Sequence, residues 1–315
     1  MENLNQTRIV AEDFLELFDF EFSQIEIDKI TEMVSERNFS FRILQNSERD
    51  RIIYDILKRI EVPFAPSGEH RKSEWDDGWS ENLNDFIQSN YSTKTLIPKY
   101  YRPSVIKRWR GNYILTESPS FEYDFFEVLR YIVFQGLLKE VNTVFEFGCG
   151  SPHNLVALSK QFPELNLYAC DWSEAAIQIA NLLREKNSLK IHGEVFDFFK
   201  PRLSFQPSSD AVFLTVGGLE QVGNKYENFL NFVIEQKPLV CIHIEPFEEL
   251  YKKDDGDLFD YLALSYHKSR NYLSGYLSEL IKLEKEGKAT INEIKRVPFG
   301  AQFHEGWNLV VWSPL

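Results

Sequence analysis

Two glycines and three acids near the ends of short apolar runs are the residues with the clearest chemical meaning. Gly148 and Gly150 follow the run NTVFEF and allow a sharp turn that a ligand can approach closely. Glu146 precedes this turn, while Asp171 and Asp197 close two later runs. A carboxylate at Asp171 can accept both ribose hydroxyls of an adenosine. An acid beside the turn would repel a pyrophosphate and favour a cationic ligand.

The chain around these residues alternates between short apolar runs and amphipathic stretches. The apolar runs are NTVFEF, LNLYACD, KIHGEVFD, DAVFLTV and PLVCIHIE, and helical patterns separate most of them. This alternation is typical of a parallel sheet covered on both faces by helices. Too few residues separate ATINEIKRV from WNLVVWSP for a crossover helix, so these runs should pair antiparallel. We expect an α/β fold with a mostly parallel, doubly wound seven-stranded sheet that ends in a C-terminal antiparallel hairpin.

The chain length predicts either one large domain or one domain of about 200 residues with a smaller part. Residues 1–60 place apolar residues three and four apart, which predicts helices. Residues 62–120 are rich in Pro, Gly and charge, which favours loops and short helices. We therefore expect a mainly helical N-terminal cap over residues 1–119 and the sheet domain over residues 120–315.

Composition excludes several classes of protein. The apolar fraction of 43% argues against disorder, and a net charge of −13 is unsuited to a nucleic-acid backbone. The sequence has no apolar run long enough to span a membrane and no signal-peptide pattern at its start. Cys149, Cys170 and Cys241 lie in or beside apolar runs, so we expect reduced thiols and a cytoplasmic protein. No metal-ligand spacing occurs, and the oligomeric state stays open.

Several segments together resemble the class I S-adenosylmethionine-dependent methyltransferases, which have a Rossmann-like fold. VFEFGCG, residues 144–150, resembles the first motif of that family, ACDWS the second and GEVFDFF the third. LTVGGLEQVG resembles the segment after the fourth strand, with Gln221 where the family often has a histidine. The resemblance covers about residues 120–315. It departs from the family at Ser151-Pro152, where a glycine is usual.

The resemblance implies an enzyme that uses S-adenosylmethionine and releases S-adenosylhomocysteine. It also implies the cofactor-binding residues: Gly148, Gly150 and Gly217 near the methionine part, Glu146 organising the turn, Asp171 on the ribose, Trp172 packed on the adenine, and Asp197 with the Phe198 backbone at the adenine edge.

Methyl transfer to a hydroxyl or a protonated amine needs a base that removes a proton. We expect the base at the end of the fourth or fifth strand, or on a late helix. The catalytic candidates are His243, Glu245 and His267, and the substrate-binding candidates are Glu220, Gln221, Arg102, Arg270 and His304.

A basic strip in residues 99–110 stands out from the acidic background. Lys99, Arg102, Lys107, Arg108 and Arg110 alternate there with aromatic residues. The strip is either a solvated face or domain interface, or a lid that recognises an anionic group on the acceptor. Under the second hypothesis, the cap selects the acceptor, and removing it abolishes turnover but leaves cofactor binding.

These observations predict a methyltransferase for a small-molecule acceptor, with an anionic or a sugar-type metabolite as the classes considered and oxygen favoured over nitrogen as the acceptor atom. Three alternatives remain. A catalytically inactive cofactor-binding partner subunit is one, since no base is certain. A NAD(P)-dependent oxidoreductase is disfavoured by the missing third glycine of G-x-G-x-x-G and by Glu146. A protein or nucleic-acid methyltransferase is disfavoured by the net charge.

Overall fold

The centre of the protein is a seven-stranded sheet. In the computed structural model, which describes residues 7–315 except 100, 102, 104, 254 and 255, the strand order is β10-β12-β9-β8-β5-β6-β7. The strands are β5 (Thr143–Phe147), β6 (Asn166–Asp171), β7 (Ile191–Val195), β8 (Val212–Val216), β9 (Val240–Glu245), β10 (Ala289–Lys295) and β12 (Asn308–Pro314). Strands β5 to β9 pair in parallel, whereas β12 pairs antiparallel with both β9 and β10. The predicted parallel sheet and C-terminal hairpin are confirmed.

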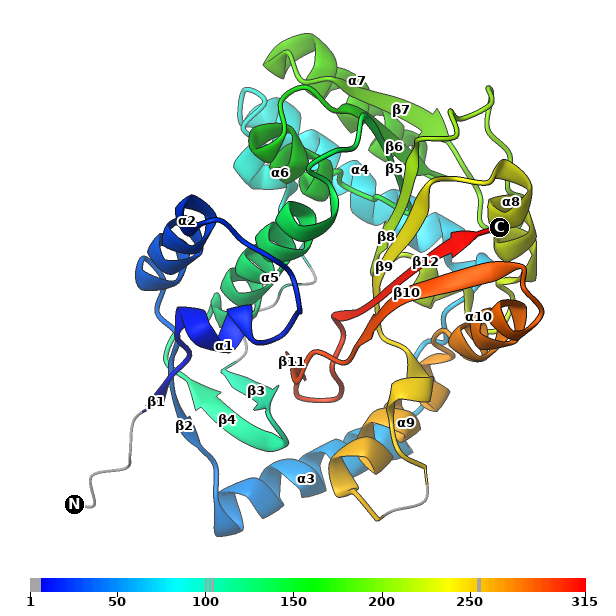
Figure 1. Ribbon diagram of the computed structural model, residues 1–315. Coiled ribbons are helices and arrows are strands. Elements are labelled where there is room, and N and C mark those ends of the chain that lie inside the picture. The colour runs from blue at the N-terminus through cyan, green and yellow to red at the C-terminus, as the bar shows by residue number, and fades with distance from the viewer. Residues whose placement is uncertain (1–6, 100, 102, 104, 254–255) are drawn as a thin grey trace.

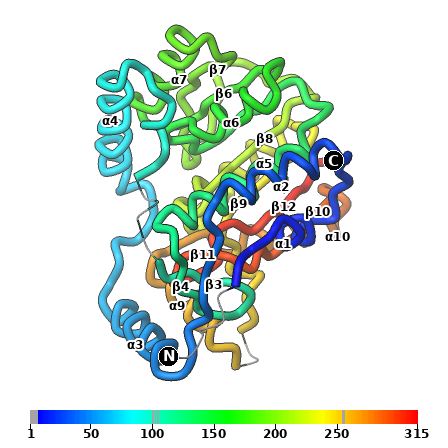
Figure 2. The backbone as a smooth tube through the Cα atoms, turned by 90° about the vertical axis from the view of Figure 1, so that its left-hand side faces the viewer, coloured from blue at the N-terminus to red at the C-terminus, as the bar shows by residue number. Residues whose placement is uncertain are grey.

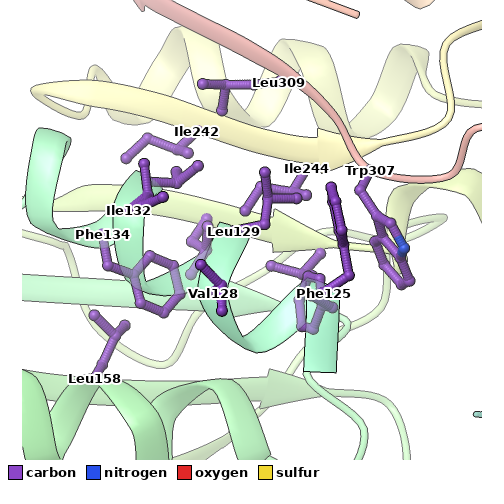
Figure 3. Close-up of a cluster of buried hydrophobic side chains, with 14 of the residues drawn as sticks. Phe125, Val128, Leu129, Ile132, Phe134, Leu158, Ile242, Ile244, Trp307 and Leu309 are labelled. Atoms are coloured by element: carbon purple, nitrogen blue, oxygen red, sulfur yellow. The ribbon is translucent and has the colours of Figure 1, made fainter. Parts of the chain in front are cut away.

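Helices cover both faces of this sheet. The parallel strands are apolar along their length, so both faces of the sheet are buried. One face packs against α5 (Phe121–Leu137), α6 (His153–Gln161) and α7 (Glu174–Asn187). Figure 3 shows part of this layer, with Leu129 and Ile132 of α5 close to Ile242 and Ile244 of β9. The other face packs against α8 (Glu227–Gln236) and α10 (Tyr276–Lys285).

The N-terminal region is helical in large part but also contains strands. Its helices are α1 (Ala11–Leu15), α2 (Gln24–Ser35), α3 (Asn46–Glu61) and α4 (Lys72–Gln88), with short 3-10 turns at Glu69–Arg71 and Thr93–Leu96. Its strands are β1 (Thr7–Arg8), β2 (Ser40–Ile43), β3 (Ile106–Trp109) and β4 (Asn112–Thr116). They form a second, antiparallel sheet in the order β1-β2-β4-β3-β11, in which β11 (Phe299–Ala301) comes from the connection between β10 and β12. The expected helical cap omitted this sheet, since its strands are short and, apart from the β3–β4 hairpin, pair with segments distant in the chain.

The two parts of the chain are joined closely. Figure 2 shows α4 beside α7, and the Ser173 hydroxyl, before α7, donates to Asp76 of α4 at 2.6 Å. Figure 1 shows α3 next to α9 (Leu258–Arg270), and Ile56 and Leu262 pack in one cluster there. Within the described part of the chain, no helix is both long enough and apolar enough to cross a bilayer.

Two cations of the basic strip are buried at this junction. Lys107 and Arg108 lie in β3, are 1% and 0% exposed, and pair with Glu122 and Glu305. Arg110 lies 3.0 Å from Asp13, and Lys99 lies 2.8 Å from Asp85. Lys107 and Arg108 therefore fit the domain-interface hypothesis, whereas Lys99 and Arg110 form partly exposed ion pairs within the N-terminal region and fit the solvated face. Arg102, a substrate-binding candidate, lies outside the described residues.

Candidate functional site

The glycine turn between β5 and α6 needs glycine at two positions. Gly148 and Gly150 have φ angles of 71° and 53°, in the left-handed region that side chains disfavour. A Cβ at position 148 would lie 2.9 Å from the Phe198 ring, and one at position 150 would collide with the indole of Trp79. The turn is thus held by its own backbone conformation and by aromatic rings packed on it.

Asp171, at the end of β6, accepts a backbone amide on each of its carboxylate oxygens, and one of these amides belongs to the glycine turn. The amide of Gly150 donates to Oδ2 at 2.8 Å, and the amide of Ser173 donates to Oδ1 at 2.9 Å. Burial raises the pKa of Asp171 to about 6, against the effect of these amide hydrogen bonds. Each oxygen keeps a second lone pair, so hydroxyl donors can still bind there.

A small cavity, which we call the turn cavity, lies against these residues. It is lined by Gly148, Asp171, Trp172, Phe196, Phe198, Phe199, Gly218, Gln221, Val222, Trp75 and Trp79. Its many aromatic rings suit a flat heterocycle, while Asp171 is the carboxylate in its wall. Sequence reasoning placed Asp171, Trp172 and Phe198 here but missed Trp75 and Trp79. The two tryptophans are four residues apart on α4 and stack at 5.9 Å, a spacing that an i, i+4 search would have found.

The turn cavity is small in this structure. Its volume is about 60 Å³, whereas small-molecule pockets usually enclose about 300–1,000 Å³. Trp75 and Trp79 of α4 form part of its wall. A ligand of nucleoside size needs more space than this cavity provides, and a displacement of these two indoles is one way to supply it. Removal of the N-terminal region would remove these two tryptophans from the cavity wall, so the prediction that cofactor binding survives this deletion depends on the remaining lining residues.

Glu146 is buried beneath the turn, where one of its oxygens is unsatisfied. Oε1 accepts from the Asn154 amide at 2.7 Å, and Arg130 in turn donates to Asn154 at 2.8 Å. Oε2 has no hydrogen-bond partner among the described residues, and burial raises the pKa of Glu146 to about 8. An unsatisfied buried carboxyl oxygen invites a polar ligand group or a bridging water. Glu146 thus fits the organising position that the resemblance implied.

Asp197 lies beside the turn cavity and does not line it. Its Oδ1 accepts from the Phe199 amide at 2.9 Å, and its Oδ2 lies 3.7 Å from the Lys72 ammonium. Lys72 also lies over the Trp172 ring at 5.5 Å. Asp197 therefore holds the loop that presents Phe198 and Phe199 to the cavity.

A second cavity, which we call the acceptor cavity, adjoins the first. It encloses about 260 Å³ and is lined by Arg71, Trp75, Glu122, Gly217, Glu220, Gln221, Arg270, Tyr272, Ala301, His304, Gly306 and Trp307. Trp75 and Gln221 line both cavities. The structure thus brings together five residues that the sequence nominated: Gly217, Glu220, Gln221, Arg270 and His304.

Glu220 follows β8 and Glu245 ends the neighbouring strand β9, but the two carboxyl groups have different contacts. Glu245 accepts backbone amides of Gly218, Leu219 and Glu220, each at 3.0 Å, and so caps the 3-10 turn Leu219–Val222. Its carboxylate is occupied by this backbone, and it does not line the acceptor cavity. Glu220 does line it, and burial together with the charge of Glu245 raises the pKa of Glu220 to about 8. Glu220 is therefore the better placed of the two to exchange a proton with a ligand.

Two histidines form a pair at the wall of the acceptor cavity. His267 Nε2 lies 2.9 Å from His304 Nδ1, and His304 alone of the two lines the cavity. Burial lowers the pKa of His267 to about 3 and that of His304 well below its ordinary value, so both rings are neutral at pH 7. His267, proposed from the sequence as catalytic, lies behind His304 and can act only by orienting it.

His243 is placed elsewhere. It is fully buried on the opposite face of the sheet, under α10. Its Nδ1 lies 2.9 Å from the Thr215 hydroxyl, while its Nε2 accepts from the Trp312 indole at 2.9 Å and lies 3.1 Å from the Tyr276 hydroxyl. Both nitrogens are occupied, and burial lowers the pKa of the ring to about 3. The structure does not bring His243 to either cavity, so it does not fit the role of base.

Comparisons with known proteins bear on the fold. No protein-family profile matches the sequence, and no curated protein matches it. The solved structure of the [4+2]-cyclase SpnF superposes with a TM-score of 0.52 at 9% identity, over 80% of this chain and 97% of that one. The chain has the class I methyltransferase fold.

The structures of two methyltransferases superpose less well on this chain. The O-methyltransferase NcsB1 from neocarzinostatin biosynthesis, in complex with S-adenosylmethionine and 2-hydroxy-5-methyl naphthoic acid, gives a TM-score of 0.42 at 15% identity over 63% of this chain. This chain spans only 59% of NcsB1. The plantazolicin methyltransferase BpumL, in complex with SAH, gives 0.41 at 15% identity, over 82% of this chain and 98% of that one. At such identities the likeness concerns the fold alone.

No group of three or more His, Cys, Asp or Glu side chains in the described ranges could hold a metal ion. Cys149, Cys170 and Cys241 are buried free thiols, and burial raises the pKa of each well above its ordinary value. Neither cavity therefore offers a thiolate nucleophile or a visible metal centre among these residues.

Proposed function

We propose that the protein is an S-adenosylmethionine-dependent methyltransferase that methylates a hydroxyl oxygen of a small-molecule acceptor. The observation that carries this proposal is the junction of the two cavities at Trp75 and Gln221. One cavity has the carboxylate and aromatic rings that suit an adenosine. The other has titratable groups that suit a proton-losing acceptor.

The cofactor side of this proposal assigns each residue a task. Asp171 accepts the ribose hydroxyls with the lone pairs that its two amide bonds leave free. Trp172 and Phe199, which stack at 6.1 Å, and Phe198 enclose the adenine. Glu146, with its unsatisfied Oε2, lies under the turn on the methionine side. When bound, S-adenosylmethionine supplies a methyl group on a positively charged sulfur.

On the acceptor side, Glu220 is our candidate base. The side-chain amide of the neighbouring Gln221 donates to Glu220 Oε1 at 2.6 Å. Gln221 lines both cavities. A carboxyl group with a pKa near 8 is close to the pH at which an enzyme works, the condition for efficient proton transfer. His304, oriented by His267, is placed to hydrogen-bond the acceptor from the opposite lining of the cavity.

Glu245 and Gly217 contribute to the proposed reaction by positioning the backbone of the acceptor cavity. Glu245 fixes the backbone that carries Glu220 and Gln221. Gly217 has a φ angle of 63° and lines the acceptor cavity, so the backbone itself forms part of the wall. Such positioning accounts for much of the rate gain in group transfer.

Binding and turnover should be tested separately, because SpnF is a cyclase of similar fold. We expect isothermal titration calorimetry to show S-adenosylhomocysteine binding and no NAD(P) binding. We expect methyl transfer from labelled S-adenosylmethionine to hydroxylated aromatic compounds. Cofactor binding without transfer to any acceptor would favour a non-transferring role, and NAD(P) binding in its place would refute the proposal.

A further inference from the structure

Three aromatic residues from different parts of the chain line the acceptor cavity. Trp75 enters from α4, Tyr272 follows α9, and Trp307 precedes β12. Trp307 is anchored by Phe126, whose ring centre is 4.5 Å away, and by Tyr101 at 6.0 Å. At about 260 Å³ the cavity is below the usual size of drug-binding pockets. These features favour a flat ligand of one or two rings.

Two arginines line the same cavity with buried nitrogens that have no protein partner. Arg71 pairs with Glu74 through Nε at 2.9 Å, while its Nη1 is unsatisfied. Arg270 donates through Nη1 to the carbonyl of Ala65 at 2.6 Å, while its Nε is unsatisfied. Buried donors without an acceptor are costly, so these two N–H groups are sites where a ligand oxygen is stabilising.

The guanidinium groups lie on aromatic rings, which limits their motion. Arg71 lies over Trp75 at 5.1 Å, and Arg270 lies over Tyr272 at 5.2 Å. Each is therefore held by a ring stack and by one hydrogen bond or ion pair. A planar guanidinium held in this way recognises a carboxylate with little further loss of conformational entropy.

The charge balance of the cavity is positive at neutral pH, although the whole chain carries −13. Two carboxyl groups, Glu122 and Glu220, line it beside the two arginines. Glu122 is neutralised by its ion pair with Lys107. Glu220 is protonated below its raised pKa of about 8. Arg71 is paired with Glu74, so within the described residues the charge of Arg270 is the one that no carboxylate lining the cavity balances.

We propose, on the basis of the function proposed above, that the acceptor is an aromatic hydroxy acid whose carboxylate is bound by Arg71 and Arg270. Its ring lies between the aromatic walls, and its hydroxyl faces the boundary with the turn cavity at Gln221. The methyl group forms a new C–O bond as its bond to sulfur breaks. The hydroxyl proton passes to Glu220 in the molecules in which this carboxyl group is ionised, and the sulfur keeps the bonding electron pair.

The test measures binding of acceptors to the protein saturated with S-adenosylhomocysteine. The probes are 2-, 3- and 4-hydroxybenzoate and 1-hydroxy-2-naphthoate, each beside its neutral carboxamide, with phenyl phosphate as a second anion. We expect at least one acid to bind ten-fold or more tightly than its amide. We expect Arg71→Gln and Arg270→Gln each to reduce that preference ten-fold or more without altering S-adenosylhomocysteine affinity. Arg71→Lys and Arg270→Lys should retain part of the preference for the acid, because lysine keeps the positive charge but lacks the two parallel N–H donors of a guanidinium group.

The matched control is Arg51→Gln, since exposed Arg51 also lies over a ring, Tyr54, and pairs with a carboxylate, Asp55. This change should alter nothing. Equal binding of acids and amides, no binding by any acid, or tighter binding of phenyl phosphate would overturn the inference while leaving the cofactor assignment standing. Failure of S-adenosylhomocysteine itself to bind would instead refute the proposed function. Circular dichroism of each variant checks that it is folded.

Discussion

The indole of Trp79 on α4 packs directly on Gly150 in the glycine turn. A side chain at position 150 would overlap this ring, and Gly150 itself has a φ angle of 53°. Trp79 comes from the N-terminal region, seventy residues before the turn that it covers. The turn cavity is therefore built by both parts of the chain, and α4 forms part of its wall.

This contact predicts a coupled effect of two substitutions. Gly150→Ala should weaken S-adenosylhomocysteine binding ten-fold or more, because it adds both a strained φ and a clash with Trp79. In a Trp79→Ala background the same change should cost less, since only the backbone strain remains. Calorimetric titration of the four proteins gives the coupling energy. Strictly additive effects would show that Trp79 does not press on the turn in solution.

Movement of α4 predicts an optical signal. If Trp75 and Trp79 move outwards to admit the nucleoside, their fluorescence should change when S-adenosylhomocysteine binds. The change should persist in Trp172→Phe and disappear in a variant with phenylalanine at both α4 positions. A signal that depends only on Trp172 would mean that α4 stays in place.

Asp171 is predicted to be the main polar contact of the cofactor. Asp171→Ala should weaken S-adenosylhomocysteine binding by about 1–3 kcal/mol, roughly five- to 150-fold, because it removes ribose acceptors and loosens Gly150. Asp210→Asn, at an exposed position bonded to Asn142, is the control and should have no effect. Unchanged affinity in Asp171→Ala would remove this residue from the site.

The raised pKa of Glu220 leads to a prediction for the pH dependence of turnover. As its pKa is raised to about 8, the base is protonated below that pH, so kcat/KM should rise with pH and level off above 8. Glu220→Gln should lower kcat/KM by about 10²–10⁴-fold and flatten this profile. Glu174→Gln, at an exposed position on α7, should change neither. If the rise persists in Glu220→Gln, another group, with His304 first among them, is the base.

Buried acids also predict the pH dependence of stability. The folded pKa values of Glu146 and Glu220, about 8, lie above the ordinary value of 4.5, so the folded state keeps protons that the unfolded state loses. Buried His243 and His267, with pKa values lowered to about 3, act oppositely, but only below about pH 6.5. The free energy of unfolding should therefore fall between pH 6.5 and 8. Glu146→Gln should make this decline shallower in urea denaturation at a series of pH values, and an unchanged slope would contradict the burial of a protonated Glu146.

The sequence predicted what depends on local order along the chain. Glycines and acids at strand ends are adjacent in a parallel sheet because the carboxyl ends of the strands meet at one edge, so Gly150 and Asp171 could be paired in advance. Contacts made by distant segments could not. Neither Trp79 on Gly150 nor the pairing of β11 with β3 has a local pattern that names its partner.

The prediction for β9 shows a second limit. Alternation correctly placed Cys241, His243 and Glu245 on one side of the strand. It could not say that this side faces α10, where His243 bonds Trp312 and Tyr276. Strand parity identifies a shared face, and only the packing of the helices shows whether that face meets a cavity or the core.

The most direct test of the proposed cofactor site is a crystal structure of the protein soaked with S-adenosylhomocysteine. We predict density for the nucleoside in the turn cavity, with the ribose hydroxyls within hydrogen-bonding distance of Asp171 and the adenine between Trp172 and Phe198. The sulfur should point towards Gln221 and the acceptor cavity. An empty turn cavity under saturating ligand, or a nucleoside bound elsewhere, would contradict the assignment.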